Sequence, residues 1–323
     1  MVPAIRFALF LLCLTLASVA AGQPGPYPSR PVRVVIPLGP GNSVEVVTRM
    51  VMQKLSATLG QAFVIEAMPG AAGAIGAERV ARSPADGYTL LAANDAVMTV
   101  LPALQAKVPF DPMRDFIPVA QMAGIPFVLV AHPGAGLNSA AQLVEAAKAA
   151  PEKLNYSSGG NGSAQHLVME MFVSATGAKL MHVPYKGAPQ AAMDVVSGQI
   201  PVTFAGVPIV AEFIRDGRLR GLGVASDRRL ASLPGVPTLK EQGIALRFAT
   251  WAGLFAPAGT PREIVARLSD EAVKALHSPE VAERLAALGF ETYGVPAAGF
   301  ARIVQADVAR MAEVIAKSGI RPE

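Results

Sequence analysis

The feature that most constrains this chain is a recurring unit: a short apolar, β-rich run, then a polar glycine loop, then a helical stretch. The unit first appears as "RPVRVVIP", "LGPGNS" and a helix expected over Val44–Leu59, and it recurs along the chain. Buried runs that alternate with helices are typical of a parallel α/β sheet with both faces covered. We therefore expect an α/β fold.

The glycine loops are the first candidates for a ligand site. In an open parallel sheet the ligand crevice lies outside the carboxyl ends of the strands. The loops "GPGNS", "ANDA", "SSGGNGS" and "PYKGAP" all occupy that end. A glycine loop before a helix offers unpaired N–H groups and the positive end of a helix dipole, which suit an anion, although any single loop can also be an ordinary capped turn. If two such sheets face each other, their loops converge on one cleft.

The first segment of the chain has the pattern of a secretory signal peptide. Residues 1–22 combine a basic start at Arg6, the apolar stretch "FALFLLCLTLASVA" and small residues up to Gly22. The apolar stretch is shorter than the roughly 18–20 residues that span a bilayer. Cys13 is the only cysteine of the chain and lies in this segment. The mature chain therefore has no means of forming disulfides, a catalytic thiolate or a cysteine-ligated zinc site.

The charge balance gives no sign of nucleic-acid binding. The chain has 28 Lys and Arg and 24 Asp and Glu, so removal of Arg6 leaves 27 against 24, a net charge of +3. The charges are spread along the chain without a run of one sign. Nucleic-acid-binding proteins normally show a clustered basic face or stripe. We expect no nucleic-acid partner.

Motifs of several enzyme classes are missing. There is no G-x-S-x-G elbow and no P-loop, and "GPGNSVE" has Val44 where a dinucleotide fingerprint needs its third glycine. His166 and Glu170 lie four apart, but a metal needs at least one more ligand, so capping or packing is favoured. Lys186 could contact an anion or could be a solvated lysine at the cleft rim. We expect a binding protein with no cofactor and no metal, and we disfavour a secreted hydrolase.

Six ordered segments carry a resemblance to a known family. The segments are "YPSRPVRVVIPLGPGNSVEVVTR", "PGAAGAIGAERVARSPADGYTLL", "YSSGGNGSAQHL", "HVPYKGAPQAAMDVVSGQ", "LPGVPTLKEQG" and "WAGLFAPAGTP". In this order they resemble the signature segments of the substrate-binding proteins of tripartite tricarboxylate transporters, the periplasmic proteins of the Bordetella uptake gene type. The resemblance extends from Tyr27 to about Ile320.

The resemblance implies a two-lobed periplasmic binding protein of type II, a Venus flytrap in which each lobe is a mostly parallel sheet flanked by helices. Lobe 1 is expected to comprise residues 23–125 and 250–323, and lobe 2 residues 126–249. The lobes are expected to close on a ligand about crossings near Gly124–Phe127 and Phe248–Trp251.

The resemblance also implies how a ligand is held. Backbone groups and ordered waters of the loop Gly39–Ser43 are expected to bind a carboxylate, with Ser157–Ser163 and Tyr185–Gly187 nearby. Carboxylates are commonly clamped by arginine, and these loops contain none, which favours neutral donors. The candidate binding residues are Gly39, Gly41, Asn42, Ser43, Asn94, Ser158, Gly159, Asn161, Gly162, Ser163, Tyr185, Gly187 and Ala205.

Three positions depart from the family pattern. Asn42 replaces a usual glycine, Glu45 replaces a usual aspartate, and Pro201 replaces an acid that is common after G-Q-[IV]. Asn tolerates left-handed backbone angles better than most residues do. The ligand therefore stays open among monocarboxylates, dicarboxylates, amino acids and aromatic acids.

The function implied is a monomeric periplasmic receptor that delivers a small carboxylate to inner-membrane permease subunits. The alternative is a periplasmic ligand sensor that presents its bound form to a membrane signalling partner. Both would use the same cleft.

Overall fold

The structure is a computed structural model that describes residues 27–105 and 107–318. Its strands form one ten-stranded sheet in the order β2-β1-β3-β9-β4-β7-β5-β6, with β8 and β10 also paired to β4. The strands are β1 (Val32–Ile36), β2 (Phe63–Ala67), β3 (Thr89–Asn94), β4 (Phe116–Ala131), β5 (Asn155–Ser158), β6 (Met181–Pro184), β7 (Val202–Gly206), β8 (Arg220–Val224), β9 (Ala249–Pro257) and β10 (Glu291–Pro296).

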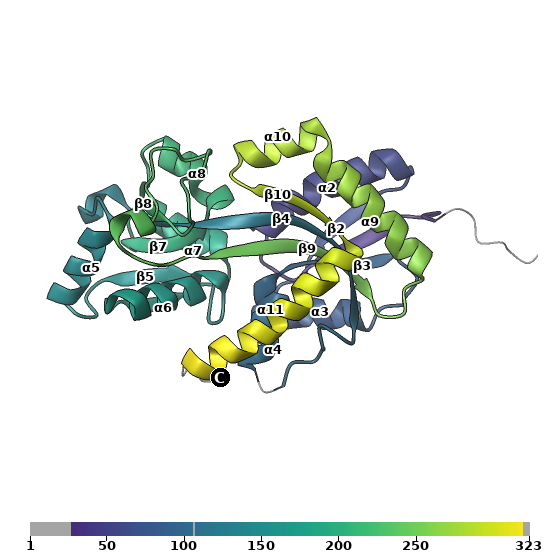
Figure 1. The fold of residues 1–323 in the computed structure, drawn as a ribbon, viewed down its shortest axis with the longest axis horizontal. Helices are drawn as coiled ribbons and strands as arrows, with labels where there is room; N and C mark the ends of the chain where they lie inside the picture. Colours follow the sequence, from purple (N-terminus) through teal and green to yellow (C-terminus); the bar gives the residue numbers. More distant parts are fainter. Residues whose placement is uncertain (1–26, 106, 319–323) are drawn as a thin grey trace, which may run out of the picture.

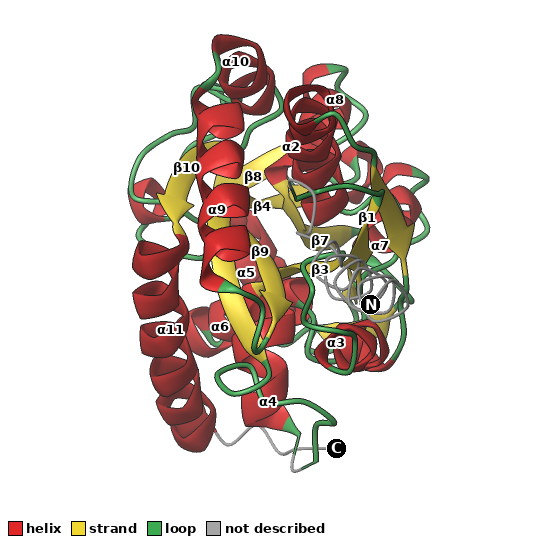
Figure 2. Cartoon of the chain, turned by 90° about the vertical axis from the view of Figure 1, so that its right-hand side faces the viewer, coloured by secondary structure: helices red, strands yellow, loops and turns green. Residues whose placement is uncertain are grey.

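Helices pack on both sides of this sheet, and α9 and α11 cover the strands β4, β9 and β10 (Figure 2). The α-helices are α2 (Ser43–Leu59), α3 (Ala74–Ala81), α4 (Leu101–Leu104), α5 (Ala140–Ala149), α6 (Ala164–Thr176), α7 (Ala188–Val196), α8 (Val207–Arg215), α9 (Arg262–His277), α10 (Pro279–Ala287) and α11 (Ala297–Ser318). Shorter turns are η2 (Ala71–Gly73), the π-helical η3 (Ala96–Val100), η4 (Pro133–Ala135) and η5 (Lys240–Gln242).

The sheet divides into two lobes that share one long strand. β1, β2 and β3 are parallel in one lobe, and β5, β6 and β7 are parallel in the other. β4 runs through both lobes, pairing antiparallel with β9 and β10 in the first and with β7 and β8 in the second. Figure 1 shows β4 and β9 crossing between the two halves, with α11 running diagonally below them in this view.

The expected two-lobed α/β fold is confirmed, with one difference in its sheet. The parallel arrangement holds for the three-strand groups, but the strands that connect the lobes add antiparallel pairs, so the sheet is mixed. The antiparallel pairs arise because β4 leaves the first lobe and β9 returns beside it. The expected signal peptide, residues 1–22, lies outside the described residues.

Apolar burial explains why the recurring units fold as they do. β1 buries Val32, Val34, Val35 and Ile36 completely, because helices cover both of its faces. α2 buries Val47, Val51 and Leu55 against this sheet, at the spacing of one helix face. None of the helices in the described ranges combines the length and the apolarity that crossing a membrane requires.

Candidate ligand site between the lobes

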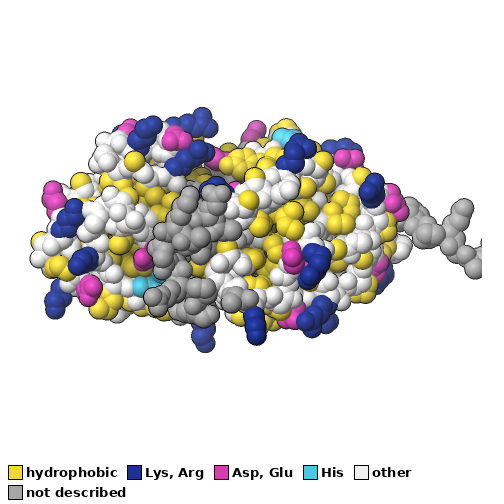
Figure 3. Space-filling view, turned by 60° about the horizontal axis from the view of Figure 1, so that its bottom comes forward, with side chains coloured by type: hydrophobic (Ala, Val, Ile, Leu, Met, Phe, Trp, Pro, Cys, Tyr) yellow, Lys and Arg dark blue, Asp and Glu magenta, His cyan; other side chains and the backbone are white. Residues whose placement is uncertain are grey.

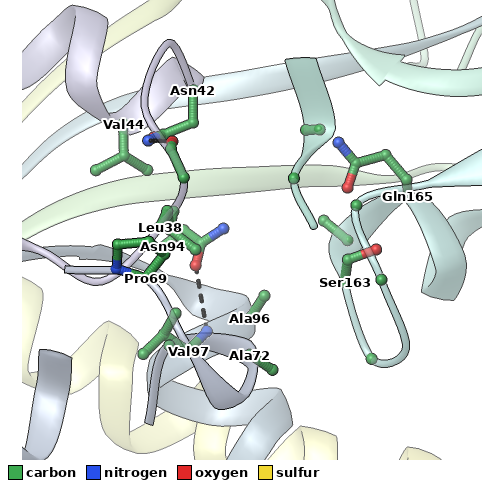
Figure 4. A pocket seen from close by; sticks show the side chains of 18 of the residues that line it. Leu38, Asn42, Val44, Pro69, Ala72, Asn94, Ala96, Val97, Ser163 and Gln165 are labelled. Carbon is green, nitrogen blue, oxygen red and sulfur yellow. Dashed lines mark hydrogen bonds between the residues drawn. The ribbon is translucent and has the colours of Figure 1, made fainter. Parts of the chain in front are cut away.

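A cavity of about 620 Å³ lies between the two lobes, where the loops at the strand ends converge. Its floor is formed by the strands that cross between the lobes, through Ile125, Phe127 and Thr250. In Figure 4, Asn42, Leu38 and Asn94 lie on one side of the pocket, and Ser163 and Gln165 face them from the other. The candidate residues that line the cavity are Gly39, Asn42, Ser43, Asn94, Gly159, Asn161, Gly162, Ser163, Tyr185 and Gly187.

Helix N-termini from both lobes meet at this cavity. The first turns of α2 and α6 line it through Ser43 and Val44 and through Ala164 and Gln165. The cap residues of α7 and α8, Gly187 and Gly206, also lie in its wall. The first amides of a helix have no acceptor within the helix, and each N-terminus carries roughly half a positive charge. These N-termini therefore make the wall electropositive independently of any charged side chain.

Formal charges are almost absent from the wall. Among the described residues that line the cavity there is no Asp, Glu or Arg, and Lys186, an exposed residue, is the one cation. In the described part of the chain, no three His, Cys, Asp or Glu side chains form a group that could hold a metal ion. Figure 3 shows basic and acidic side chains interspersed over the visible face of both lobes.

The start of α2 explains two of the departures from the family pattern. Asn42 is the N-cap: its Oδ1 accepts from the Glu45 amide at 3.0 Å, and its Nδ2 donates to the Gly39 carbonyl at 2.6 Å. Glu45 Oε2 accepts from the Gly41 amide at 2.7 Å, and Arg49 donates to Glu45 Oε1. This reciprocal arrangement resembles a capping box, except that Glu45 accepts from the residue before the N-cap, and it fixes the helix start. Asn42 thus orders the loop, because both ends of its side-chain amide are engaged.

The start of α6 is capped in the same manner. Ser163 Oγ accepts from the His166 amide at 3.3 Å, and His166 Nδ1 accepts from the Gly162 amide at 3.1 Å. Gly162 has a φ of 72°, in the left-handed region that glycine adopts without strain. His166 and Glu170 therefore lie within the capped first part of α6, and His166 Nε2 is 3.9 Å from Glu170 Oε1.

Two other polar candidates are held by the protein. Asn94 Oδ1 accepts from the Val97 amide at 3.2 Å, as Figure 4 shows, and this bond orients its Nδ2 group. The Tyr185 hydroxyl donates to Asp194 Oδ2 at 2.5 Å, and this hydrogen bond raises the pKa of Tyr185 to about 12. Tyr185 is thus part of the wall, with its hydroxyl engaged by Asp194.

Three of the candidate residues, Gly41, Ser158 and Ala205, lie outside the cavity wall. The Gly41 amide is taken by Glu45, and the residue is exposed. Ser158 is fully buried: its Oγ accepts from the Gly160 amide at 3.1 Å and lies 2.6 Å from His182 Nε2. Ala205 is buried in the core of the second lobe, and the next residue of β7 lines the cavity in its place.

One wall segment carried no functional signal in the sequence. The turn Pro69–Gly73 lines the cavity, and Ala71 and Ala72 within it have φ angles of 46° and 52°. Left-handed alanines are uncommon, and such strain often marks a functional site. The alanine side chains offer no chemistry of their own, so this turn is not among the candidate binding residues. Further residues of the wall outside the candidate set include Leu38, Val44, Ala96, Val97, Gln105, Gln165, Ile209 and Thr250.

The chain matches a family model over residues 47–320, that of the tripartite tricarboxylate transporter family receptor. It is 37% identical over 285 residues to a UPF0065 protein from the tcbD–tcbE intergenic region of Pseudomonas sp., covering 88% of this chain and 84% of that protein. The structure of R. palustris Rpa4515 with adipate matches with a TM-score of 0.88 at 32% identity, covering 92% of this chain and all of the other.

A second solved relative, MatC of Rhodopseudomonas palustris with bound malate, matches with a TM-score of 0.84 at 29% identity. The match covers 90% of this chain and 100% of MatC. The fold and the matched length agree with these comparisons. The chain belongs to the tripartite tricarboxylate transporter receptor family.

Proposed function

We propose that this chain is a periplasmic solute-binding receptor that captures a small carboxylate between its lobes and delivers it to a tripartite tricarboxylate-type permease. The observation that carries the proposal is the convergence of the N-termini of α2, α6, α7 and α8 on a cavity wall without Asp, Glu or Arg. Helix N-termini are ready-made anion sites, since their amides and their dipole both favour negative charge.

The hydroxyl of Ser43 supports the same function. Ser43 lines the cavity and is 7% exposed, and its Oγ has no hydrogen-bond partner among the described residues. A buried hydroxyl without a partner costs about 1–3 kcal/mol, so pairing with a ligand oxygen or a water molecule would relieve this cost. A carboxylate oxygen would accept from Ser43 and from the neighbouring first-turn amides.

A small dicarboxylate is the first ligand class to test. The solved relatives contain adipate and malate, which are both dicarboxylates. Helix starts face the cavity from both lobes, so two carboxylates could each meet a set of amides. The volume of about 620 Å³ leaves room for bridging water beside a short diacid. Such water bridges are nearly as favourable in enthalpy as direct hydrogen bonds.

A thermal-shift panel tests the proposal. The protein is unfolded and refolded to strip any carried ligand, then heated with mono-, di- and aromatic carboxylates and with the dimethyl ester of each diacid. A ligand at 100 times its dissociation constant should stabilise the fold by about 2.7 kcal/mol. Equal stabilisation by an acid and its uncharged ester, or stabilisation by no carboxylate, would contradict carboxylate capture.

Export and assembly form a separate part of the proposal. Sequencing the N-terminus of the protein from a periplasmic extract should give a start between Ala21 and Gln23. Light scattering behind a sizing column should give a monomer. An intact Met1 in the soluble fraction would contradict export, whatever the ligand.

A further inference from the structure

The helix starts of α2 and α6 have the same design, although they belong to opposite lobes. Each begins after a glycine in the left-handed region, Gly41 with a φ of 76° and Gly162 with a φ of 72°. In each, the third helical residue accepts from the amide of that glycine: Glu45 in α2 at 2.7 Å and His166 in α6 at 3.1 Å. The two differ in the accepting group, which is a carboxylate in one lobe and an imidazole in the other.

The hydrogen bond from Gly162 fixes the tautomer of His166. An amide N–H can only donate, so Nδ1 must be unprotonated, and the proton of the neutral ring lies on Nε2. This nitrogen lies 3.9 Å from Glu170 Oε1. A protonated imidazole has hydrogens on both nitrogens and no acceptor left for Gly162. Protonation of the imidazole therefore removes the acceptor of the α6 start, whereas the α2 start has a carboxylate as its acceptor.

The groups around His166 act on its charge in opposite directions. The titratable groups of the described residues that lie against it include Glu170 of α6 and His182 of β6, with Tyr156 of β5 behind His182. The rings of His166 and His182 stack at 4.2 Å, and the Tyr156 hydroxyl donates to Glu170 Oε1 at 2.8 Å. Burial raises the pKa of Tyr156, so this hydroxyl stays protonated. Glu170 attracts an imidazolium, and a charged His182 would repel it.

We infer that His166 is a positioning residue: its neutral imidazole holds the loop Gly159–Ser163 in the conformation that receives the ligand, and its protonation releases that loop. The inference rests on the proposed function, because Gly159, Gly162 and Ser163 line the cavity. Acidification then weakens ligand capture on the α6 side of the cleft and leaves the α2 side intact.

Nuclear magnetic resonance of the ligand-free protein tests the titration directly. At about pH 8, the ¹⁵N signals of the His166 ring should report the Nε2–H tautomer. The Gly162 amide should lose its protection from hydrogen exchange as His166 gains a proton. In His166→Gln, whose side-chain oxygen can accept at every pH, the Gly162 amide should stay protected down to about pH 5.5. A neutral ring protonated on Nδ1, or a Gly162 amide indifferent to His166, overturns the inference.

Calorimetry with malate tests the consequence for binding. The ionisation of malate is the same for both proteins, so the ratio of the wild-type and His166→Gln dissociation constants isolates the titration of the protein. We expect this ratio to rise about three- to tenfold between about pH 8 and about pH 5.5, the equivalent of one hydrogen bond. His277→Gln, on α9 and outside the cavity wall, should keep the wild-type dependence.

A constant ratio, or a ratio that falls on acidification, overturns the inference. If malate binds neither protein at any pH, dicarboxylate capture is contradicted instead. The exchange experiment on Gly162 then still decides the role of His166.

Discussion

Ser43 and Thr48, both on α2, carry the two buried hydroxyl oxygens that find no hydrogen-bond partner among the described residues. Ser43 lines the interlobe cavity, whereas Thr48 is fully buried and is not part of its wall. The same kind of unpaired group thus occurs once in a residue of the cavity wall and once in a residue away from the wall.

This contrast gives a matched pair of variants. Ser43→Ala should weaken carboxylate binding by about 0.5–1.5 kcal/mol, the net worth of one hydrogen bond, with little change in the stability of the free protein. Thr48→Val removes a hydroxyl of the same kind and should leave affinity unchanged while maintaining or raising stability. Calorimetry and denaturant unfolding measure both. Normal affinity in Ser43→Ala would show that this hydroxyl does not contact the ligand.

The two ends of α2 give a second pair. Gly41 before its start and Gly60 at its end have φ angles of 76° and 69°. Both positions have room for a methyl group. Alanine at either site should lower the unfolding free energy by about 1–2 kcal/mol, the cost of a left-handed L-residue. Only Gly41→Ala should also weaken ligand binding, because alanine disfavours the φ of 76° at which the Gly41 amide donates to Glu45 and orders the loop. Equal ligand affinities in the two variants would show that the loop before α2 does not contribute to ligand binding.

Asp95 predicts a pH dependence of stability. Although Asp95 keeps some accessible surface, desolvation of its carboxyl and the nearby Asp307 raise its pKa from 3.8 to about 8. The folded protein therefore holds a proton that the unfolded chain releases. The stability contributed by Asp95 is complete below about pH 4 and is lost as the pH rises through about 8.

Asp95→Asn should therefore gain stability relative to the wild type as the pH rises over this window, by at most about 1.4 kcal/mol per pH unit. The gain should level off above about pH 8. Urea unfolding of both proteins at several pH values measures the difference. A difference that does not change with pH would mean that Asp95 is ionised in the folded protein at neutral pH.

A small apolar cluster links the lobes beside the cavity. It contains Val100 of η3, Leu167 of α6 and Met311 of α11. Met311→Ala should loosen the contact of α11 with the second lobe, enlarge the radius of gyration of the free protein and weaken binding, because less of the protein is then closed. Val304→Ala, on the same helix but buried within the first lobe, should lower stability without opening the lobes. Small-angle scattering distinguishes the two.

The units of strand, loop and helix could be predicted from the sequence because each has an apolar pattern of its own. The helix expected over Val44–Leu59 is observed over Ser43–Leu59, bounded by an Asn cap and a left-handed glycine. β4 was harder to predict: it begins at Phe116 and contains Pro118 and Pro126. Proline usually argues against an inner strand, and the register of β4 shifts just after Pro118.

The candidate site was predictable as a set of loops but not as a set of contacts. The sequence identifies Asn42 as a polar residue in a glycine loop, but only the structure shows that its side-chain amide is used within that loop. The same holds for Ser158, whose hydroxyl is held beneath the loop by Gly160 and His182. Such roles depend on which way a side chain points, and sequence spacing does not determine this.

The near absence of charged side chains from the cavity wall has a consequence for how the protein meets its ligand. The field of a helix N-terminus fades within about one turn, whereas a formal charge acts over about 8 Å in physiological salt. Such a wall provides little electrostatic guidance at a distance, and the empty cleft needs no counter-ion. Selection therefore takes place after contact, when ligand oxygens meet the amides, and affinity should vary little with ionic strength.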